Sequence, residues 1–253
     1  MNKRRCEVSR LVNDAHVHVG PSAPWVPEVQ PARNIEEYIK VMEKYGVGKA
    51  IIFPNPGVGE GYAKQNDVIA QAQKKYPSKI IGFGRTDPRL GEGAIKELER
   101  FVNKLGLKGV KLHPIVECFR PDHPAFEPFF KAIEDLHVPI LFHSSPGFFA
   151  EPHLIAVVAE RHPKLKICLG HLYGSMLPII EKQKNLWVET SGVSLPSTVT
   201  GAAKIAPDRV MYGSDWPYLN PRVELVKVEE GIEDKKLLAK VLSENFENFL
   251  QSS

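Results

Sequence analysis

The stretch VNDAHVHVG, residues 12–20, is typical of a buried β-strand that ends in two histidines one residue apart. Side chains two positions apart on a strand point to the same face and begin about 6.6–7 Å apart, so His16 and His18 can both reach one ion. Burying an imidazole without a partner is costly. The pattern therefore predicts either a metal ion bound by both rings or two histidines hydrogen-bonded to water or carboxylates.

Further strand-like runs follow along the whole chain. Short apolar segments rich in β-branched residues alternate with longer amphipathic segments, and the strand pattern occurs eight times. The predicted strands cover residues 11–19, 49–55, 79–87, 109–114, 139–145, 166–174, 186–193 and 209–217.

The segments between these strands carry helix signals. In NIEEYIKVMEKYG, residues 34–46, Asn34 can cap the first turn and Gly46 can end the helix. Other amphipathic segments cover residues 92–106, 125–137, 153–163 and 234–250. The proline-rich segment 20–33 falls inside the first strand–helix unit, so it is interpreted as a long loop and the whole chain, 1–253, as one domain.

A strand followed by a helix, repeated, requires parallel strands with crossover helices on the outside. Eight such units in 253 residues predict a single-domain α/β fold, the (β/α)8 TIM barrel. An open, doubly wound sheet is the alternative, because sequence cannot show closure. Its usual dinucleotide fingerprint, GxGxxG in the first unit, is missing.

Composition excludes several classes of protein. Charged residues make up 25% of the chain and hydrophobic residues 43%, as in soluble globular proteins. The net charge of +3 is too small to predict nucleic acid or an anionic membrane as partner. The three cysteines form no CxxC pair, and the chain has neither a signal-peptide pattern nor an apolar run of about 20 residues. We expect a cytoplasmic protein.

Polar residues gather where the predicted strands end. In a parallel barrel those ends form the reactive face, and five of the nine histidines fall there. The remaining four, at positions 123, 137, 153 and 162, are expected in solvent. The polar residues at the strand ends are His16, His18, Lys111, His113, His143, His171, Glu189 and Asp215.

Imidazoles together with a carboxylate suit one divalent metal ion. Zinc fits this ligand set best, although manganese, iron or nickel could occupy it. Such an ion lowers the pKa of a bound water from 15.7 toward about 7, which makes hydroxide available at neutral pH. The cluster therefore predicts a metal-activated water as the reagent.

With these residues in place, the chain resembles the amidohydrolase superfamily, in particular the amidohydrolase-related branch that includes aminocarboxymuconate-semialdehyde decarboxylase. The motifs DAHVH, LFHSS, LGHLYG and YGSDWPY carry the resemblance in order along the chain, and GVKLHP and ENFENFL are also typical of that branch. The resemblance implies that His16, His18, His143 and Asp215 bind a single divalent ion. It implies that His171 is an acid/base group or a ligand of a second ion.

Asp215 is expected to hold the metal and also to take the proton from the attacking water; the alternative is a cap on the following turn. Lys111 would neutralise a substrate carboxylate in a mononuclear site. In some relatives a carboxylated lysine near this place bridges two metals, so Lys111 could have that role instead. His113 could contact substrate, support the metal site, or only end its strand.

Three further residues are predicted to bind substrate. Arg85 could grip a carboxylate bidentately or form a structural ion pair with Asp87 or another neighbour. Glu189 and Trp216 are expected to line the substrate site, with core packing as the alternative for Trp216.

The leading hypothesis is a metal-dependent hydrolase that acts on an amide, lactone or ester bond of a small, carboxylate-bearing molecule. The alternative is metal-dependent, non-oxidative decarboxylation of an aromatic or unsaturated acid, which the same ligands permit. A third hypothesis is a barrel that binds a ligand without turnover. The expected partner is a small-molecule substrate, and a homodimer is plausible for such a barrel.

Overall fold

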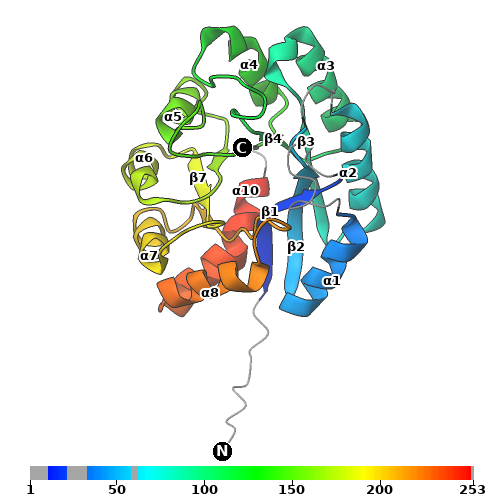
Figure 1. The fold of residues 1–253 in the computed structure, drawn as a ribbon. Coiled ribbons are helices and arrows are strands. Elements are labelled where there is room, and N and C mark those ends of the chain that lie inside the picture. Colours follow the sequence, from blue (N-terminus) through cyan, green and yellow to red (C-terminus); the bar gives the residue numbers. More distant parts are fainter. Residues whose placement is uncertain (1–10, 22–32, 58–61, 252–253) are drawn as a thin grey trace, which may run out of the picture.

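The computed structural model describes residues 11–21, 33–57 and 62–251. Cys6 and most of the predicted 20–33 loop lie outside these ranges. The strands form one eight-stranded parallel sheet in the order β1 to β8 (Figure 1). Their bounds are β1 Val12–Val19, β2 Val47–Pro54, β3 Ile80–Arg85, β4 Gly109–Leu112, β5 Ile140–Phe142, β6 Ile167–Leu169, β7 Leu186–Glu189 and β8 Val210–Met211.

The sheet closes on itself where the chain leaves β8. The Ala15 amide donates to the carbonyl oxygen of Tyr212 at 2.9 Å, and the His18 amide donates to that of Trp216 at 2.8 Å. Val17 forms a parallel bridge with Trp216. These bonds confirm the (β/α)8 barrel, and the open-sheet alternative is wrong.

All eight predicted strands are present, but most end earlier than predicted. The strand predicted at 209–217 is only Val210–Met211, so Asp215 lies in the loop after β8. The backbone there turns away from the sheet, and Asp215 has a φ of 53°. Asp215, His113, His143 and His171 therefore lie in loops at the barrel mouth, whereas His16, His18, Lys111 and Glu189 lie within their strands.

The helices surround the strands (Figure 1). Asn34 caps α1 as predicted, because its side chain accepts from the Glu37 amide at 3.0 Å, and Gly46 ends the helix with a φ of 70°. The segments 92–106 and 234–250 each contain a π-helical turn, Arg100–Lys104 and Lys240–Glu244. The α-helices are α1 Ile35–Tyr45, α2 Ala63–Lys75, α3 Glu92–Glu99, α4 Glu127–Asp135, α5 Pro152–Arg161, α6 Leu177–Lys182, α7 Pro196–Ile205, α8 Pro221–Gly231, α9 Lys235–Ala239 and α10 Asn245–Leu250.

Helix α10 covers the amino-terminal end of the barrel. Phe246 and Phe249 join the side chains that fill the barrel interior, and the ring of Phe249 lies 5.4 Å from that of Trp187. Lys166, which precedes β6, donates to the carbonyl oxygens of Asn248 and Gln251. The interior is thus closed at this end, and the polar strand ends lie at the other.

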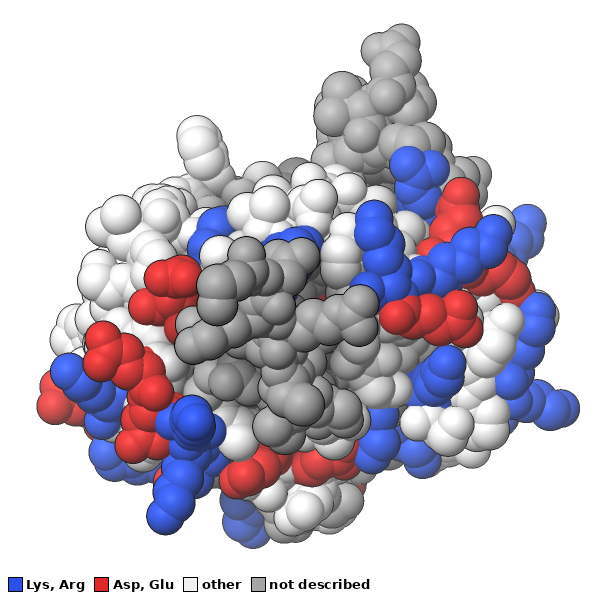
Figure 2. Space-filling view, turned by 90° about the horizontal axis from the view of Figure 1, so that it is seen from below, with Lys and Arg blue, Asp and Glu red and all other residues white. Residues whose placement is uncertain are grey.

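The charge on the surface and the length of the helices bear on possible partners. On the face shown in Figure 2, basic and acidic side chains are interspersed over the described residues, and neither sign forms a continuous area. Among the described residues, none of the helices has the length and apolar character that crossing a bilayer requires.

Gly84 in β3 tests the packing between strand and helix. A Cβ atom there would lie 2.5 Å from the buried ring of Phe101, so we expect Gly84→Ala to destabilise the protein by about 1–3 kcal/mol. Gly93 in α3 is the control, because its nearest neighbour would be the Leu90 Cβ at 3.6 Å. Gly93→Ala should be neutral or stabilising by up to ~1 kcal/mol. Urea unfolding measures both, and equal stabilities would contradict the packing described.

Candidate metal centre

Three predicted ligands meet at the carboxyl end of β1. The Nε2 atoms of His16 and His18 lie 3.2 Å apart, and each lies 3.3 Å from Oδ1 of Asp215. All three residues are buried. Among the described residues, Asp215 Oδ1 has no hydrogen-bond donor. A buried carboxylate oxygen without a donor, facing two imidazole nitrogens, fits a bound divalent cation.

Burial controls the protonation of this group. It lowers the pKa of His16 and His18 well below the usual value, with smaller contributions from Lys111 at His16 and from His16 at His18. The two rings are therefore neutral and have lone pairs for a metal ion. Burial, followed by the charge of Glu189, raises the pKa of Asp215 well above its usual value. A cation at this position would relieve that penalty.

His143 and His171 lie beside this group and contact each other. His143 Nδ1 is 2.9 Å from His171 Nε2, and the ring of His113 stacks on that of His143 with centroids 3.7 Å apart. In the described part of the chain, the ligand atoms that cluster within 4.8 Å are those of His16, His18 and Asp215, and those of His16, His171 and Glu189. The role of His143 as fourth ligand stays a prediction.

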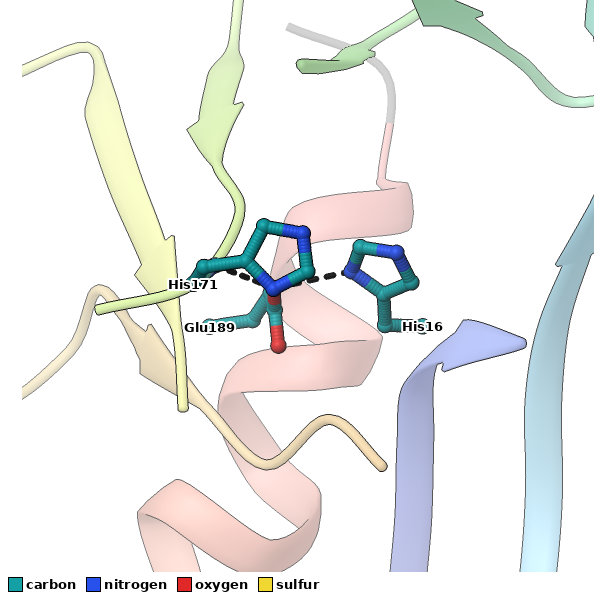
Figure 3. Close-up of side chains that lie close together, drawn as sticks. All are labelled: His16, His171 and Glu189. Carbon is teal, nitrogen blue, oxygen red and sulfur yellow. Dashed lines mark hydrogen bonds and ion pairs between the residues drawn. The ribbon is translucent and has the colours of Figure 1, made fainter. Parts of the chain in front are cut away.

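Glu189 lies under His16 and not on a surface open to substrate. It is fully buried, and its carboxylate accepts from His16 Nδ1 at 2.8 Å and from the His171 amide at 2.7 Å (Figure 3). The same carboxylate accepts from the Ser191 hydroxyl and amide at 2.8 Å each. A Cβ at Gly213 would lie 2.0 Å from Glu189 Oε2, so only glycine leaves room there. These are the contacts of a positioning residue, unlike the substrate contact expected from sequence.

Lys111 is buried and reaches the same centre. Its Nζ lies 3.3 Å from His16 Nε2 and 4.6 Å from the centroid of the Phe53 ring. Burial, followed by the charge of Arg85, lowers the pKa of Lys111 to about 7. The position suits either role considered for Lys111, because both place its amine next to the metal ligands.

Arg85 forms an ion pair, but not with Asp87. Its Nε lies 2.8 Å from Oε1 of Glu117, and its Nη1 donates to the Pro54 carbonyl at 3.1 Å. The Nη2 atom is buried and has no acceptor among the described residues. Glu117 also accepts from the Tyr62 hydroxyl at 2.9 Å. Sequence reasoning missed Glu117, which lies in an irregular loop after β4 with no periodic signal.

Of two aromatic residues after β8, the one predicted to line the substrate site lies in the core, and the one not predicted lies at the site. Trp216 is only 8% exposed and its ring packs 5.1 Å from that of Tyr38 in the core, so the packing alternative describes it. Tyr218, which was not predicted, places its ring 4.8 Å from that of His18 and donates to Asn55 Oδ1 at 3.0 Å. The aromatic residue at the site is thus two positions further along the loop.

One of the histidines assigned to solvent is buried. His162 is 3% exposed, and its Nε2 lies 3.0 Å from Glu127 Oε1. The error arose because the end of α5 packs against α4, which a single helical pattern does not reveal.

Comparison with known proteins agrees with this geometry. The sequence profile of the amidohydrolase family matches residues 13–250. A gamma-resorcylate decarboxylase from Rhizobium sp. (strain MTP-10005) is 25% identical, with 72% of this chain and 76% of that enzyme covered. A 4-sulfomuconolactone hydrolase from Rhizobium radiobacter is 24% identical, with 83% of this chain and 77% of that enzyme covered.

A solved structure has the same fold. It is a 5-carboxyvanillate decarboxylase from Novosphingobium aromaticivorans in complex with manganese and 4-hydroxy-3-methoxy-5-nitrobenzoic acid. It superposes with a TM-score of 0.77 at 19% identity, and 95% of this chain and 96% of that chain are covered. These matches confirm the family resemblance inferred from the motifs.

The buried and half-buried histidines of this centre predict acid sensitivity. Burial lowers the pKa of His16, His18, His113 and His143 well below 6.5, and that of His171 to about 4. Below about pH 6.5 the unfolded chain therefore binds more protons than the folded chain, so the free energy of unfolding should fall as pH falls. Each histidine contributes up to about 1.4 kcal/mol per pH unit.

Urea unfolding with a chelator present, between pH 7.5 and 5, measures this slope. His143→Asn should reduce it by about one proton. His137→Asn, at an exposed position whose φ of 53° asparagine tolerates, should leave it unchanged. A stability that stays flat down to pH 5.5 would contradict the burial of neutral imidazoles.

Proposed function

The chain belongs to the amidohydrolase family, and we propose that it is a metal-dependent, non-oxidative decarboxylase of an aromatic or unsaturated carboxylic acid. The observation that carries the proposal is Asp215 Oδ1, which has no donor in the described part of the chain and lies 3.3 Å from the Nε2 atoms of His16 and His18. The reaction is favoured by the similarity to a gamma-resorcylate decarboxylase. This reverses the order expected from sequence, where hydrolysis came first.

His16, His18 and Asp215 would hold the ion, with His143 as the predicted fourth ligand. When bound, a divalent ion supplies positive charge that orients the acid and stabilises the negative charge developing in the reaction. Sequence favours zinc, whereas the related 5-carboxyvanillate decarboxylase was crystallised with manganese. We therefore propose manganese or zinc.

The chain's own residues would bind the acid and supply a proton. Decarboxylation breaks the bond between carbon and the carboxylate, releases carbon dioxide and requires one proton at that carbon. Asp215 or His171, which both lie at this centre, would shuttle that proton. His171, whose pKa burial lowers to about 4, is neutral at pH 7 and suits proton acceptance. Lys111 would neutralise the substrate carboxylate.

Hydrolysis is the second candidate, and the similarity to a 4-sulfomuconolactone hydrolase over 83% of this chain favours it. Asp215 would then take a proton from the attacking water, and His171 would pass one to the leaving group. Carbon dioxide release without water incorporation separates decarboxylation from hydrolysis. Incorporation of oxygen from ¹⁸O-labelled water without carbon dioxide release would select the hydrolase.

Metal content and turnover test the proposal together. We expect about one manganese or zinc ion per chain, and carbon dioxide release from a panel of hydroxybenzoic and muconic acids. His16→Ala and Asp215→Asn should each lower kcat/KM by at least ~100-fold, whereas Lys96→Ala, at an exposed position on α3, should not. A metal-free native protein, or an undiminished His16→Ala variant, ends the proposal. Tight metal binding with neither decarboxylation of these acids nor hydrolysis of amides, lactones or esters would favour the non-catalytic barrel.

Arg85 is proposed as an anchor for a second oxygen-bearing group of the substrate. Its Nη2 is buried and has no acceptor in residues 11–21, 33–57 and 62–251, while Glu117 and Pro54 hold the rest of the guanidinium. Arg85→Gln should raise KM by about 10- to 100-fold with a smaller effect on kcat, because this contact is made equally in ground and transition states. An acid lacking the second group should show no such change. A loss confined to kcat would contradict this role.

A further inference from the structure

Asn66, in the first turn of α2, holds the main chain of Arg85 where β3 ends. Its Oδ1 accepts from the Arg85 amide at 2.8 Å, and its Nδ2 donates to the Arg85 carbonyl oxygen at 2.9 Å. The register of β2 with β3 runs from Ile80 to Gly82, so at Arg85 this side chain supplies the hydrogen bonds that a neighbouring strand would make. Asn66 is fully buried.

The orientation of the Asn66 side chain is fixed by Glu97 of α3. Its Nδ2 also donates to Glu97 Oε1 at 2.7 Å. Arg100 in turn donates to both carboxylate oxygens of Glu97, at 2.7 and 2.9 Å. An asparagine amide has one oxygen that accepts and two hydrogens that donate, and all of these have partners here. A rotated amide would place its oxygen against a carbonyl and a carboxylate, so the amide keeps the orientation that holds Arg85.

Tyr62 lies one turn before Asn66, on the same side of the helix. The Cζ atom of Arg85 lies 5.2 Å from the centroid of the Tyr62 ring, and the Tyr62 hydroxyl donates to Glu117 Oε1 at 2.9 Å. Glu117 and Pro54 accept from Nε and Nη1, and Nη2 has no acceptor among the residues that the structure describes. The start of α2 thus holds Arg85 at its main chain and at its guanidinium.

We propose that Asn66 is a positioning residue for substrate recognition, which fixes the main chain of Arg85 and thereby the place where the guanidinium presents Nη2 to the substrate. The inference rests on the proposed function, in which Arg85 anchors a second oxygen-bearing group. The N–H directions of a guanidinium are rigid, so a shift of the Arg85 main chain moves the hydrogen bond with it. Arg85 lies opposite Lys111 in the register of β3 with β4, and Lys111 reaches His16 at the metal centre.

The Nε–H signal of Arg85 can be read in the chelated, metal-free protein with ¹⁵N-labelled arginine, and its loss in Arg85→Gln assigns it. Asn66→Ala should shift this signal and speed its exchange with solvent by at least ~10-fold, because a looser main chain opens the bond to Glu117. Asn185→Ala is the matched control. Asn185 also donates to main-chain carbonyl oxygens, just before β7, and its loss should leave the Arg85 signal unchanged.

Substrate affinity is the second measurement. For an acid with a second oxygen-bearing group, Asn66→Ala should raise KM by about 10-fold with a smaller effect on kcat. For an acid that lacks this group, KM should not change. In the Arg85→Gln background, Asn66→Ala should cause no further rise in KM, because both changes remove the same interaction. Asn185→Ala should raise KM for neither acid.

Glu97 keeps the test decisive if Asn66→Ala fails to fold. Glu97→Ala should shift the Arg85 signal in the same direction, whereas Glu97→Gln, which keeps an acceptor oxygen for the Asn66 amide, should leave the signal in place. An Arg85 signal unchanged in both alanine variants, a KM that rises equally for both acids, or an effect that adds to that of Arg85→Gln would overturn the inference. An Arg85 signal that depends on Asn66 in a protein without turnover would support the positioning and contradict the proposed function.

Discussion

The buried carboxylate of Glu189 is the interaction on which the rest of the site depends. A buried carboxylate is tolerated only when hydrogen-bond donors surround it, and this one accepts from β1 through His16 and from the loops after β6 and β7. Its need for donors therefore brings three segments of the barrel together. His16, one of the two histidines that face Asp215, is held by the Glu189 carboxylate. Glycine at position 213 leaves the space that this carboxylate occupies.

A second buried group lies at the ends of β3 and β4, where Arg85 pairs with Glu117. The negative charge of Glu117 balances the positive charge of Arg85, and one guanidinium nitrogen has no acceptor within the part of the chain that the structure describes. Lys111, by contrast, has no carboxylate within ion-pair distance among the described residues. Together with the proposed divalent ion, Arg85 and Lys111 would suit the small anionic acid that we propose as substrate. The same charges serve a decarboxylase and a hydrolase, because both reactions develop negative charge on oxygen or carbon near the ion.

The site residues meet because a parallel barrel brings the carboxyl ends of all its strands to one face. His16 and Asp215 are far apart in the chain, yet the bonds that close β1 onto the segment after β8 place them 3.3 Å apart. Asp215 and His171 both have positive φ values, 53° and 61°, which direct their side chains in the loops where the strands end. Backbone conformations of this kind are costly and persist where the surrounding structure determines them.

The sequence by itself determined the eightfold alternation, the cap at Asn34 and the paired histidines, because each depends on residues that are near one another in the chain. It also located Glu189 at the end of its strand, whereas Asp215, expected at the end of the eighth strand, lies in the loop after β8. Only the tertiary structure decided that Glu189 orients His16, that Glu117 holds Arg85, and that Tyr218 rather than Trp216 faces His18. These contacts join loops that carry no periodic pattern, and which side chains meet there is fixed by how the strands close and how each loop turns.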